Sequence, residues 1–293
     1  MAAHLAHLDQ MKVLPVVTAV MEQAGVNVPR DRWDVRTTGS AHVIVNMGAE
    51  LSVRVAKTQQ TGYLVARRTE ILRRLPTALP FAVPRPITRV ITRNGFTAVG
   101  LTWIKGEPRL QGAAPPKQLA TLLKAIHGID YRGYGPYLDM VHEHWGGREN
   151  WEEVLRTEVV PQLLSGAQKI ALAAIDRVVS LDPVDPVLIH GDLAGHNILW
   201  NGDKLVGVID WDHASIGDPA VDHAALGNFY GWDSLTKALT TEQIERAQIV
   251  ARLLPLQSLA YSMRNGMGGA ITRLAVERAD EWYLDHRSEV LAA

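Results

Sequence analysis

The chain lacks cysteine, and it has no excess of charge of either sign. Without cysteine, the 293 residues can form no disulfide bond and no metal site with thiolate ligands, which is typical of a protein from a reducing compartment. The 30 lysine and arginine residues and the 31 aspartate and glutamate residues leave a formal net charge of −1. The basic excess of nucleic-acid-binding proteins is therefore missing, and we expect no nucleic-acid partner.

Long hydrophobic runs, internal repeats and low-complexity segments are also missing. The apolar run Val13–Met21 is interrupted by Pro15 and is too short to cross a bilayer. We therefore expect a cytoplasmic protein without a membrane partner, and the sequence gives no indication of the oligomeric state. A hydrophobic content of 47% is sufficient for a packed core, in one large or two modest domains.

The most informative segment begins with His190-Gly191-Asp192 and continues to Asn197. The spacing of the histidine, the aspartate and the asparagine is that of the catalytic loop of protein kinases, H-R-D-x-x-x-x-N. Phosphoryl transfer mainly requires an oriented acceptor hydroxyl and neutralised phosphate charge. Asp192 is the candidate general base, and Asn197 and the later Asp210 are candidate magnesium ligands.

A hairpin is predicted between the two candidate magnesium ligands. The segment Asn201-Gly202-Asp203 separates two short apolar runs, 198–200 and 205–209. Turn residues flanked by such runs are typical of a β-hairpin. A hairpin would return Asp210 to the neighbourhood of Asn197, which two isolated residues would not guarantee.

These motifs carry a resemblance to a known family. His190-Gly191-Asp192, Asn197 and the segment 209–222, which contains I-D-W-D and G-D-P, resemble the aminoglycoside and macrolide phosphotransferase family of antibiotic kinases. The resemblance implies that Asp192 is the catalytic base and that Asn197 and Asp210 bind Mg²⁺. It implies a mainly structural role for the G-D-P segment, here Asp218 with Asp222.

The expected fold is α+β and resembles the two-lobed protein kinase fold. We expect a small N-terminal β-sheet lobe for nucleotide binding, residues 1–104. A larger, mostly helical lobe, residues 105–293, would carry catalysis and acceptor binding. The active site is expected in the cleft between the two lobes.

The N-terminal half contains β-rich runs at 35–38, 42–46 and 51–56. Gly39 and Ser40 lie between the first two runs and are candidates for a loop over the nucleotide phosphates. In the third run, Arg54 is aligned with the lysine that kinases use to hold phosphates. An arginine fork can bind phosphate oxygens, although with different geometry. Lys57 is an alternative for this role.

A helix is predicted over 62–75, and it carries Glu70, the expected ion-pair partner of Arg54. Strands are expected at 87–92 and 97–103. The segment Leu101–Pro108 is expected to be the hinge, where the backbone of Trp103 and Ile104 would pair with the purine of the nucleotide.

The C-terminal half has mostly helical patterns. Helices are expected at 118–127, 151–164, 167–180, 222–230, 241–254, 256–264 and 270–291. His142-Glu143-His144 lies in a polar stretch without a third metal ligand. We interpret these histidines as solvent-exposed residues and not as a metal site.

In the family that the motifs resemble, the helices after the magnesium-binding aspartate build the acceptor pocket. The apolar and aromatic content of 226–263 favours a macrolide over a polycationic aminoglycoside. The candidate acceptor contacts are Phe229, Tyr230, Trp232, Leu254, Tyr261 and Met263. The resemblance to macrolide kinases implies GTP as the donor, with ATP as the alternative.

Two other functions remain open. One is a kinase of an aminoglycoside or of a small metabolite of the choline or homoserine type. The other is a nucleotide-binding pseudokinase that serves as an interaction module. The joint presence of Asp192, Asn197 and Asp210 argues against the pseudokinase, because pseudokinases commonly lack one of these residues.

Overall fold

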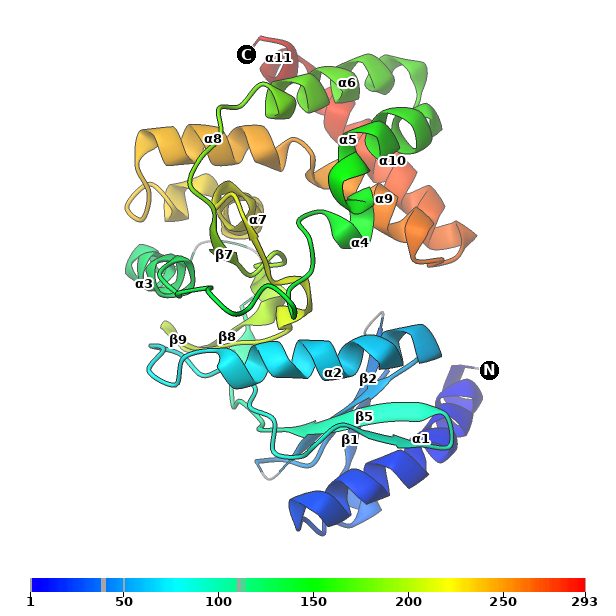
Figure 1. The fold of residues 1–293 in the computed structure, drawn as a ribbon. Helices are drawn as coiled ribbons and strands as arrows, with labels where there is room; N and C mark the ends of the chain where they lie inside the picture. Colours follow the sequence, from blue (N-terminus) through cyan, green and yellow to red (C-terminus); the bar gives the residue numbers. More distant parts are fainter. Residues whose placement is uncertain (1, 38–40, 50, 110–111, 113, 293) are drawn as a thin grey trace. The chain divides into compact units, whose positions relative to one another are not determined.

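The computed structural model describes residues 2–37, 41–49, 51–109, 112 and 114–292, which fall into two compact units (Figure 1). The first unit comprises Met1–Arg109, Arg132–Leu138 and His196–Asp212. The second comprises Leu110–Tyr131, Asp139–Gly195 and His213–Ala293. An antiparallel sheet in the N-terminal part and a helical C-terminal part confirm the predicted α+β, kinase-like class.

The first unit is built on a five-stranded antiparallel sheet with the order β1-β2-β3-β5-β4. The strands are β1 (Asp34–Arg36), β2 (His42–Asn46), β3 (Ser52–Ala56), β4 (Ile91–Arg93) and β5 (Phe96–Leu101). Successive side chains of a strand point to opposite faces of the sheet. Val53 and Val55 of β3 are therefore on one face, and Arg54 between them is on the other. The expected strand 87–92 is reduced to its last part, which begins β4 at Ile91.

A helix covers each face of this sheet (Figure 1). Helix α1 (Ala2–Ala24) packs Val16, Val17 and Val20 into the core with the valines of β2 and β3. The sequence pattern did not predict α1, because Pro15 lies inside it and a proline usually disfavours a helix interior. Helix α2 (Gln59–Arg74) corresponds to the helix predicted over 62–75 and begins with the side chain of Thr58 as its cap.

A second sheet in the first unit contains β6 (Glu107–Pro108), β8 (Ile198–Asn201) and β9 (Lys204–Val208). Strands β8 and β9 form the predicted hairpin, which turns at Gly202 with a φ of +57°. Arg109 binds this turn by donating to the carbonyl oxygen of Gly202 at 2.8 Å. Pairing of β6 with β8 explains why the first unit continues past the expected boundary at 104 and includes a later segment of the chain.

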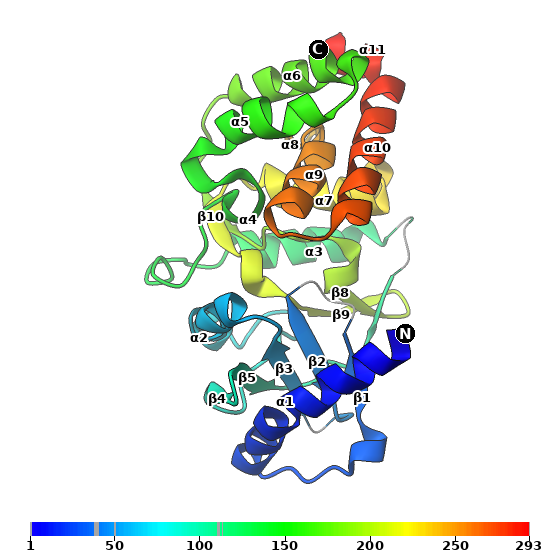
Figure 2. The ribbon, with the colours of Figure 1, turned by 90° about the vertical axis from the view of Figure 1, so that its right-hand side faces the viewer.

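The second unit is mostly helical (Figure 2). A two-stranded sheet pairs β7 (Val187–Ile189) with β10 (Ser215–Gly217), and β7 directly precedes the His190-Gly191-Asp192 motif. Its helices are α3 (Pro116–His127), α4 (Glu143–Gly146), α5 (Trp151–Val154), α6 (Ser165–Val179), α7 (Ala220–Tyr230), α8 (Thr241–Ala251), α9 (Leu254–Arg264), α10 (Gly269–Asp285) and α11 (Arg287–Leu291). Buried side chains of α6, α9 and α10 form the main helical core.

Two expected helices of this unit are interrupted. The helix predicted over 151–164 ends as α5 at Val154 and continues as a π-helical turn over Leu155–Val159 and a 3-10 turn over Val160–Gln162. Pro161 in this last turn has no N–H to donate, which disfavours a continuous α-helix. The helix predicted over 270–291 is divided at His286 into α10 and α11. Within the described residues, no helix is long and apolar enough to cross a membrane.

Candidate active site

The candidate catalytic loop follows β7 in the second unit and is fixed by Asp222. The backbone N–H groups of His190 and Gly191 donate to the two carboxylate oxygens of Asp222 at 2.9 and 3.0 Å. The ring Nε2 of His127 lies 3.1 Å from the same carboxylate. Burial alone would raise the pKa of Asp222, but the hydrogen bond and the charge of His127 outweigh it and hold this pKa below its usual value. Asp222 is therefore a buried, ionised anchor of the loop.

Gly191 has a conformation and surroundings that permit no side chain. Its φ is +79°, and a Cβ atom would lie 2.2 Å from the carbonyl oxygen of His213. This contact explains why a glycine stands where the protein kinase motif has an arginine. The partly exposed Asp192 follows, and its backbone N–H donates to Nδ1 of His190 at 3.3 Å. The predicted base is thus carried by a loop held at several points.

The first unit brings the two candidate magnesium ligands together. The backbone N–H of Ile209 donates to the carbonyl oxygen of Asn197 at 2.9 Å, so Asp210 directly follows the residue paired with Asn197. The hairpin prediction is confirmed in this respect. Asp210 has a φ of +60°, a left-handed conformation that is uncommon for a non-glycine residue and is concentrated at functional sites. Its side chain is 45% exposed, in contrast to the buried Asn197.

The donor set at this position fits Mg²⁺. The ion prefers oxygen ligands and is usually held by one or two protein carboxylates, with phosphates and water completing its coordination. Asp210 offers a carboxylate, and Asn197 offers an amide oxygen. Among the described residues, no group of three or more histidine, cysteine, aspartate or glutamate side chains could hold a metal ion. Two oxygen donors leave most of the coordination of Mg²⁺ to phosphates and water, so Asp210 and Asn197 suit a metal that is shared with a nucleotide.

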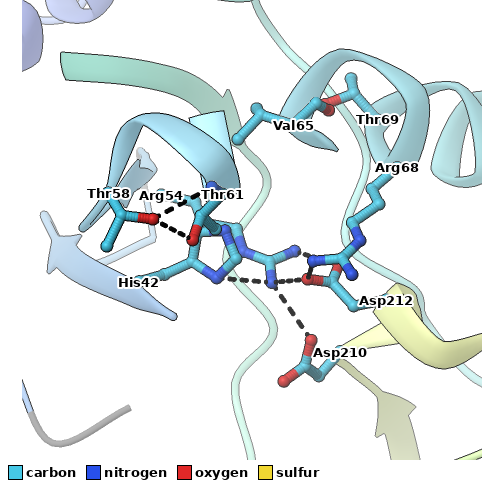
Figure 3. A network of polar contacts seen from close by, with 9 residues as sticks. All are labelled: His42, Arg54, Thr58, Thr61, Val65, Arg68, Thr69, Asp210 and Asp212. Carbon is cyan, nitrogen blue, oxygen red and sulfur yellow. Dashed lines mark hydrogen bonds and ion pairs between the residues drawn. The ribbon is translucent and has the colours of Figure 1, made fainter. Parts of the chain in front are cut away.

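Arg54 lies at the centre of a network of charged groups in the first unit (Figure 3). Its two terminal nitrogens donate to the two carboxylate oxygens of Asp212 at 2.7 and 2.5 Å. Its Nη2 also approaches Oδ1 of Asp210 at 3.2 Å, and Arg68 from α2 donates to Asp212 at 2.9 Å. Burial alone would raise the pKa of Asp212, but Arg54 and Arg68 hold it well below its usual range.

His42 is the third neighbour of the Arg54 guanidinium. Its Nδ1 lies 2.9 Å from Nη2 of Arg54. Since a guanidinium can only donate, this ring nitrogen must accept, and His42 is therefore neutral. Burial, assisted by the charge of Arg54, lowers the pKa of His42 to about 3. The network thus combines the ion pair of Arg54 and Asp212 with one neutral histidine.

The predicted ion pair between Arg54 and Glu70 is wrong. Glu70 instead contacts Arg73 and Arg74 of its own helix at 3.2 and 2.5 Å. Successive helix residues differ by 100°, so residues 68 and 70 point about 200° apart, and only one of them can face the sheet. Arg68 takes that position with 12% exposure, whereas Glu70 is 37% exposed.

The partner of Arg54, Asp212, was missed by the sequence analysis. The sequence feature that could have indicated it is the second aspartate of the I-D-W-D segment. Lys57, the alternative phosphate-binding cation, donates instead to the carbonyl oxygen of Thr37 at 2.7 Å. Arg54 is therefore the strand cation that the structure brings to Asp210.

The remaining predicted nucleotide contacts are Gly39, Ser40, Trp103 and Ile104. Gly39 and Ser40 lie outside the described residues. The partly exposed ring of Trp103 lies under the guanidinium of Arg36, 5.8 Å from its centroid. Ile104 is buried, and its side chain fills the space beside Gly207 of β9.

The six candidate acceptor contacts divide into core and partly exposed residues. Tyr230 is only 2% exposed, so it contributes to the core and offers almost no surface to a ligand. The ring of Phe229 fills the space beside Gly195 of the catalytic loop, and the ring of Trp232 fills that beside Gly227. Tyr261 and Met263 pack on the helical core, and Leu254 is half-buried at the start of α9.

The prediction that His142 and His144 are solvent-exposed is wrong. Both are half-buried, and the ring of His144 stacks on that of His213 with a centroid distance of 3.6 Å. Burial lowers the pKa of His142 to about 4. The ring of His142 packs against Trp145 and Trp151, which the polar appearance of the segment did not indicate.

Comparison with known proteins identifies the family of the chain. The model of the phosphotransferase enzyme family matches residues 21–255. The viomycin phosphotransferase of Streptomyces vinaceus is 28% identical over 251 residues, which cover 77% of this chain and 85% of that protein.

Solved structures of similar fold include the GDP complex of aminoglycoside 2'-phosphotransferase-IIIa. It has a TM-score of 0.78 at 17% identity, with 93% of this chain and 99% of that chain covered. Macrolide 2'-phosphotransferase type I has a TM-score of 0.70 at 18% identity, with 94% and 97% covered. These likenesses show the fold, and the family match includes the whole catalytic-loop motif. The chain therefore belongs to the phosphotransferase enzyme family.

Proposed function

We propose that this protein transfers the γ-phosphoryl group of a purine nucleoside triphosphate to a hydroxyl group of an antibiotic, in the presence of Mg²⁺. Asp192 accepts the hydroxyl proton, and the hydroxyl oxygen forms a bond to the γ-phosphorus. The bond from that phosphorus to the bridging oxygen breaks, and the nucleoside diphosphate leaves with the electron pair. Asn197 and Asp210 would hold Mg²⁺, which neutralises phosphate charge when bound.

The observation that carries this proposal is the fixed catalytic loop. The Asp222 carboxylate accepts hydrogen bonds from the backbone N–H groups of both His190 and Gly191, so Asp192 follows an immobilised turn. A base that must orient a hydroxyl along one line of attack requires such rigidity. The joint presence of this loop and of the Asn197 and Asp210 pair favours an enzyme over a pseudokinase.

For the donor, we propose GTP, with ATP as the alternative. The solved structures of similar fold include complexes with GDP and with ATP, which supports a purine nucleotide of either kind. Arg54 is proposed to face the phosphates, because it is a strand cation in contact with Asp210.

For the acceptor, viomycin is the first candidate, because the Streptomyces vinaceus relative, which is 28% identical to the chain, is a viomycin phosphotransferase. A macrolide, favoured by the apolar composition of 226–263, is the second. Much of that composition belongs to the core, since Leu226, Leu256 and Leu259 are fully buried. The half-buried Phe229 and Tyr261 are the aromatic residues that support a macrolide most directly.

The test is phosphorylation of an antibiotic panel, followed by mass spectrometry. The purified protein is incubated with Mg²⁺ and either GTP or ATP, together with viomycin, an erythromycin-type macrolide or kanamycin. We expect a mass gain of one phosphate on one class of acceptor and none with Asp192→Asn. Nucleotide binding without turnover on any acceptor would support the pseudokinase and contradict the proposal.

A further inference from the structure

The carboxylate of Asp212 joins cations from two different elements of the first unit. Arg54 of β3 binds it through two parallel hydrogen bonds, and Arg68 of α2 binds one of its oxygens (Figure 3). The side chain of Asp212 is 6% exposed. A carboxylate buried to this extent is stable only when such partners compensate its charge. Asp212 is therefore a fixed point in the network.

The two parallel bonds also determine where the guanidinium of Arg54 points. A planar fork held at both terminal nitrogens cannot rotate without breaking one of the bonds. In this orientation Nη2 reaches Nδ1 of His42 at 2.9 Å and Oδ1 of Asp210 at 3.2 Å. The strand cation is thus directed at the candidate metal ligand by Asp212.

We propose that Asp212 is the positioning residue for Arg54. It orients the strand cation, as a glutamate of a helix orients the strand lysine in protein kinases. Asp212 acts on the nucleotide through Arg54 and does not touch it. The inference rests on the proposed function, since it assumes that Arg54 meets the phosphates of a nucleoside triphosphate. Helix α2 takes part through Arg68, whereas Glu70 contacts Arg73 and Arg74 of its own helix.

This arrangement couples the cation to the metal ligand. Asp210 and Asp212 are separated by one residue, the buried Trp211, at the start of a 3-10 turn. A displacement of this segment moves the metal ligand and the anchor of Arg54 together. A glutamate on a separate helix would leave the two free to move independently.

The experiment measures nucleotide binding in the absence of any acceptor. Dissociation constants for GTP, ATP and the nucleosides guanosine and adenosine are obtained by calorimetry or by displacement of a fluorescent nucleotide. Asp212→Asn should weaken triphosphate binding about tenfold or more, because an amide cannot accept two charge-assisted bonds from Arg54. Nucleoside binding should stay within about twofold, since it uses no phosphate contact.

Glu70→Gln is the matched control, because it makes the same change from carboxylate to amide on the helix. It should leave triphosphate binding unchanged. The second test is a double-mutant cycle with Arg54→Met. If Asp212 acts through Arg54, then Asp212→Asn should have no further effect on triphosphate binding in the Arg54→Met background.

Calorimetric melting would show whether Asp212→Asn folds. If it does not fold, Arg54→Lys, which keeps the positive charge, provides a second test. One ammonium group cannot make the two parallel bonds, so this variant should also weaken GTP binding selectively, by roughly threefold or more. Equal losses of affinity for GTP and guanosine, or a loss of GTP affinity with Glu70→Gln as large as with Asp212→Asn, would overturn the inference and leave the proposed function standing. A wild-type protein that binds no nucleotide would overturn the proposed function and the inference with it.

Discussion

The carbonyl oxygen of His213 lies 2.2 Å from the position that a Cβ atom of Gly191 would occupy. This contact ties the candidate catalytic loop to the segment before β10 and leaves room only for glycine. The φ of Gly191, +79°, imposes the same restriction independently of the contact. Gly191 and His213, which are distant in sequence, therefore restrict the loop conformation in addition to Asp222.

Gly191→Ala should consequently damage the loop. The methyl group meets a backbone atom that cannot move away like a flexible side chain, and the positive φ adds strain. We expect a loss of about 2–4 kcal/mol in the free energy of unfolding, together with a large loss of kcat. Urea unfolding measures the first effect. Gly202→Ala, in a turn with no atom within 4 Å of the added Cβ, is the control for positive φ alone.

Asp192→Asn should lower kcat by about 10²–10⁴-fold while nucleotide binding persists. The amide keeps the size of the side chain but cannot take the acceptor proton. Steady-state kinetics and nucleotide titration separate the two effects. Asp203→Asn, at a side chain that is 86% exposed in the hairpin turn, should retain parental turnover. Parental turnover by Asp192→Asn itself would remove Asp192 from the role of base.

Asp210→Ala should abolish magnesium-dependent turnover, and Asn197→Ala should weaken it less. A carboxylate contributes a full charge to a divalent ion, whereas an amide oxygen contributes a dipole. Titration of activity with Mg²⁺, and of binding with Mn²⁺ as a spectroscopic probe, gives the affinity for the metal. Unchanged metal dependence in both variants would contradict the assignment of these ligands.

Residue spacing was sufficient to predict the local structure that carries candidate site residues close to one another in sequence. The His190 to Asn197 loop and the hairpin before Asp210 follow from local patterns, because turn chemistry and short strands are encoded within a few residues. The fold class followed from the same motifs through the family resemblance. Comparisons with known proteins then confirmed it.

Contacts between distant residues could not be predicted in this way. Arg54 and Asp212 are 158 positions apart, and nothing in either segment identifies the other as its partner. The choice between Arg68 and Glu70 depends on the rotation of α2 about its axis, which a helical pattern with several charged residues leaves open. The stacking of His144 on His213 likewise joins two segments that are distant in sequence.

Buried histidines should make the protein sensitive to mild acid. Burial, assisted by the charge of His127, lowers the pKa of His223 from 6.5 to about 4. Between these two values the unfolded chain binds a proton at this position and the folded chain does not, so the free energy of unfolding falls as the pH decreases. The loss from His223 should be on the order of 2–3 kcal/mol between pH 7 and pH 4.

We therefore expect urea unfolding at pH 7 and pH 4.5 to show a marked loss of stability in the wild type and a smaller one in His223→Gln. The glutamine is polar but does not titrate, so it removes this contribution to the pH dependence while keeping a hydrogen-bonding side chain. His42 and His142, with pKa values of about 3 and 4, should preserve part of the change in unfolding free energy with pH in this variant. An identical slope in His223→Gln and the wild type would show that His223 is already protonated, or already exposed, in the folded protein.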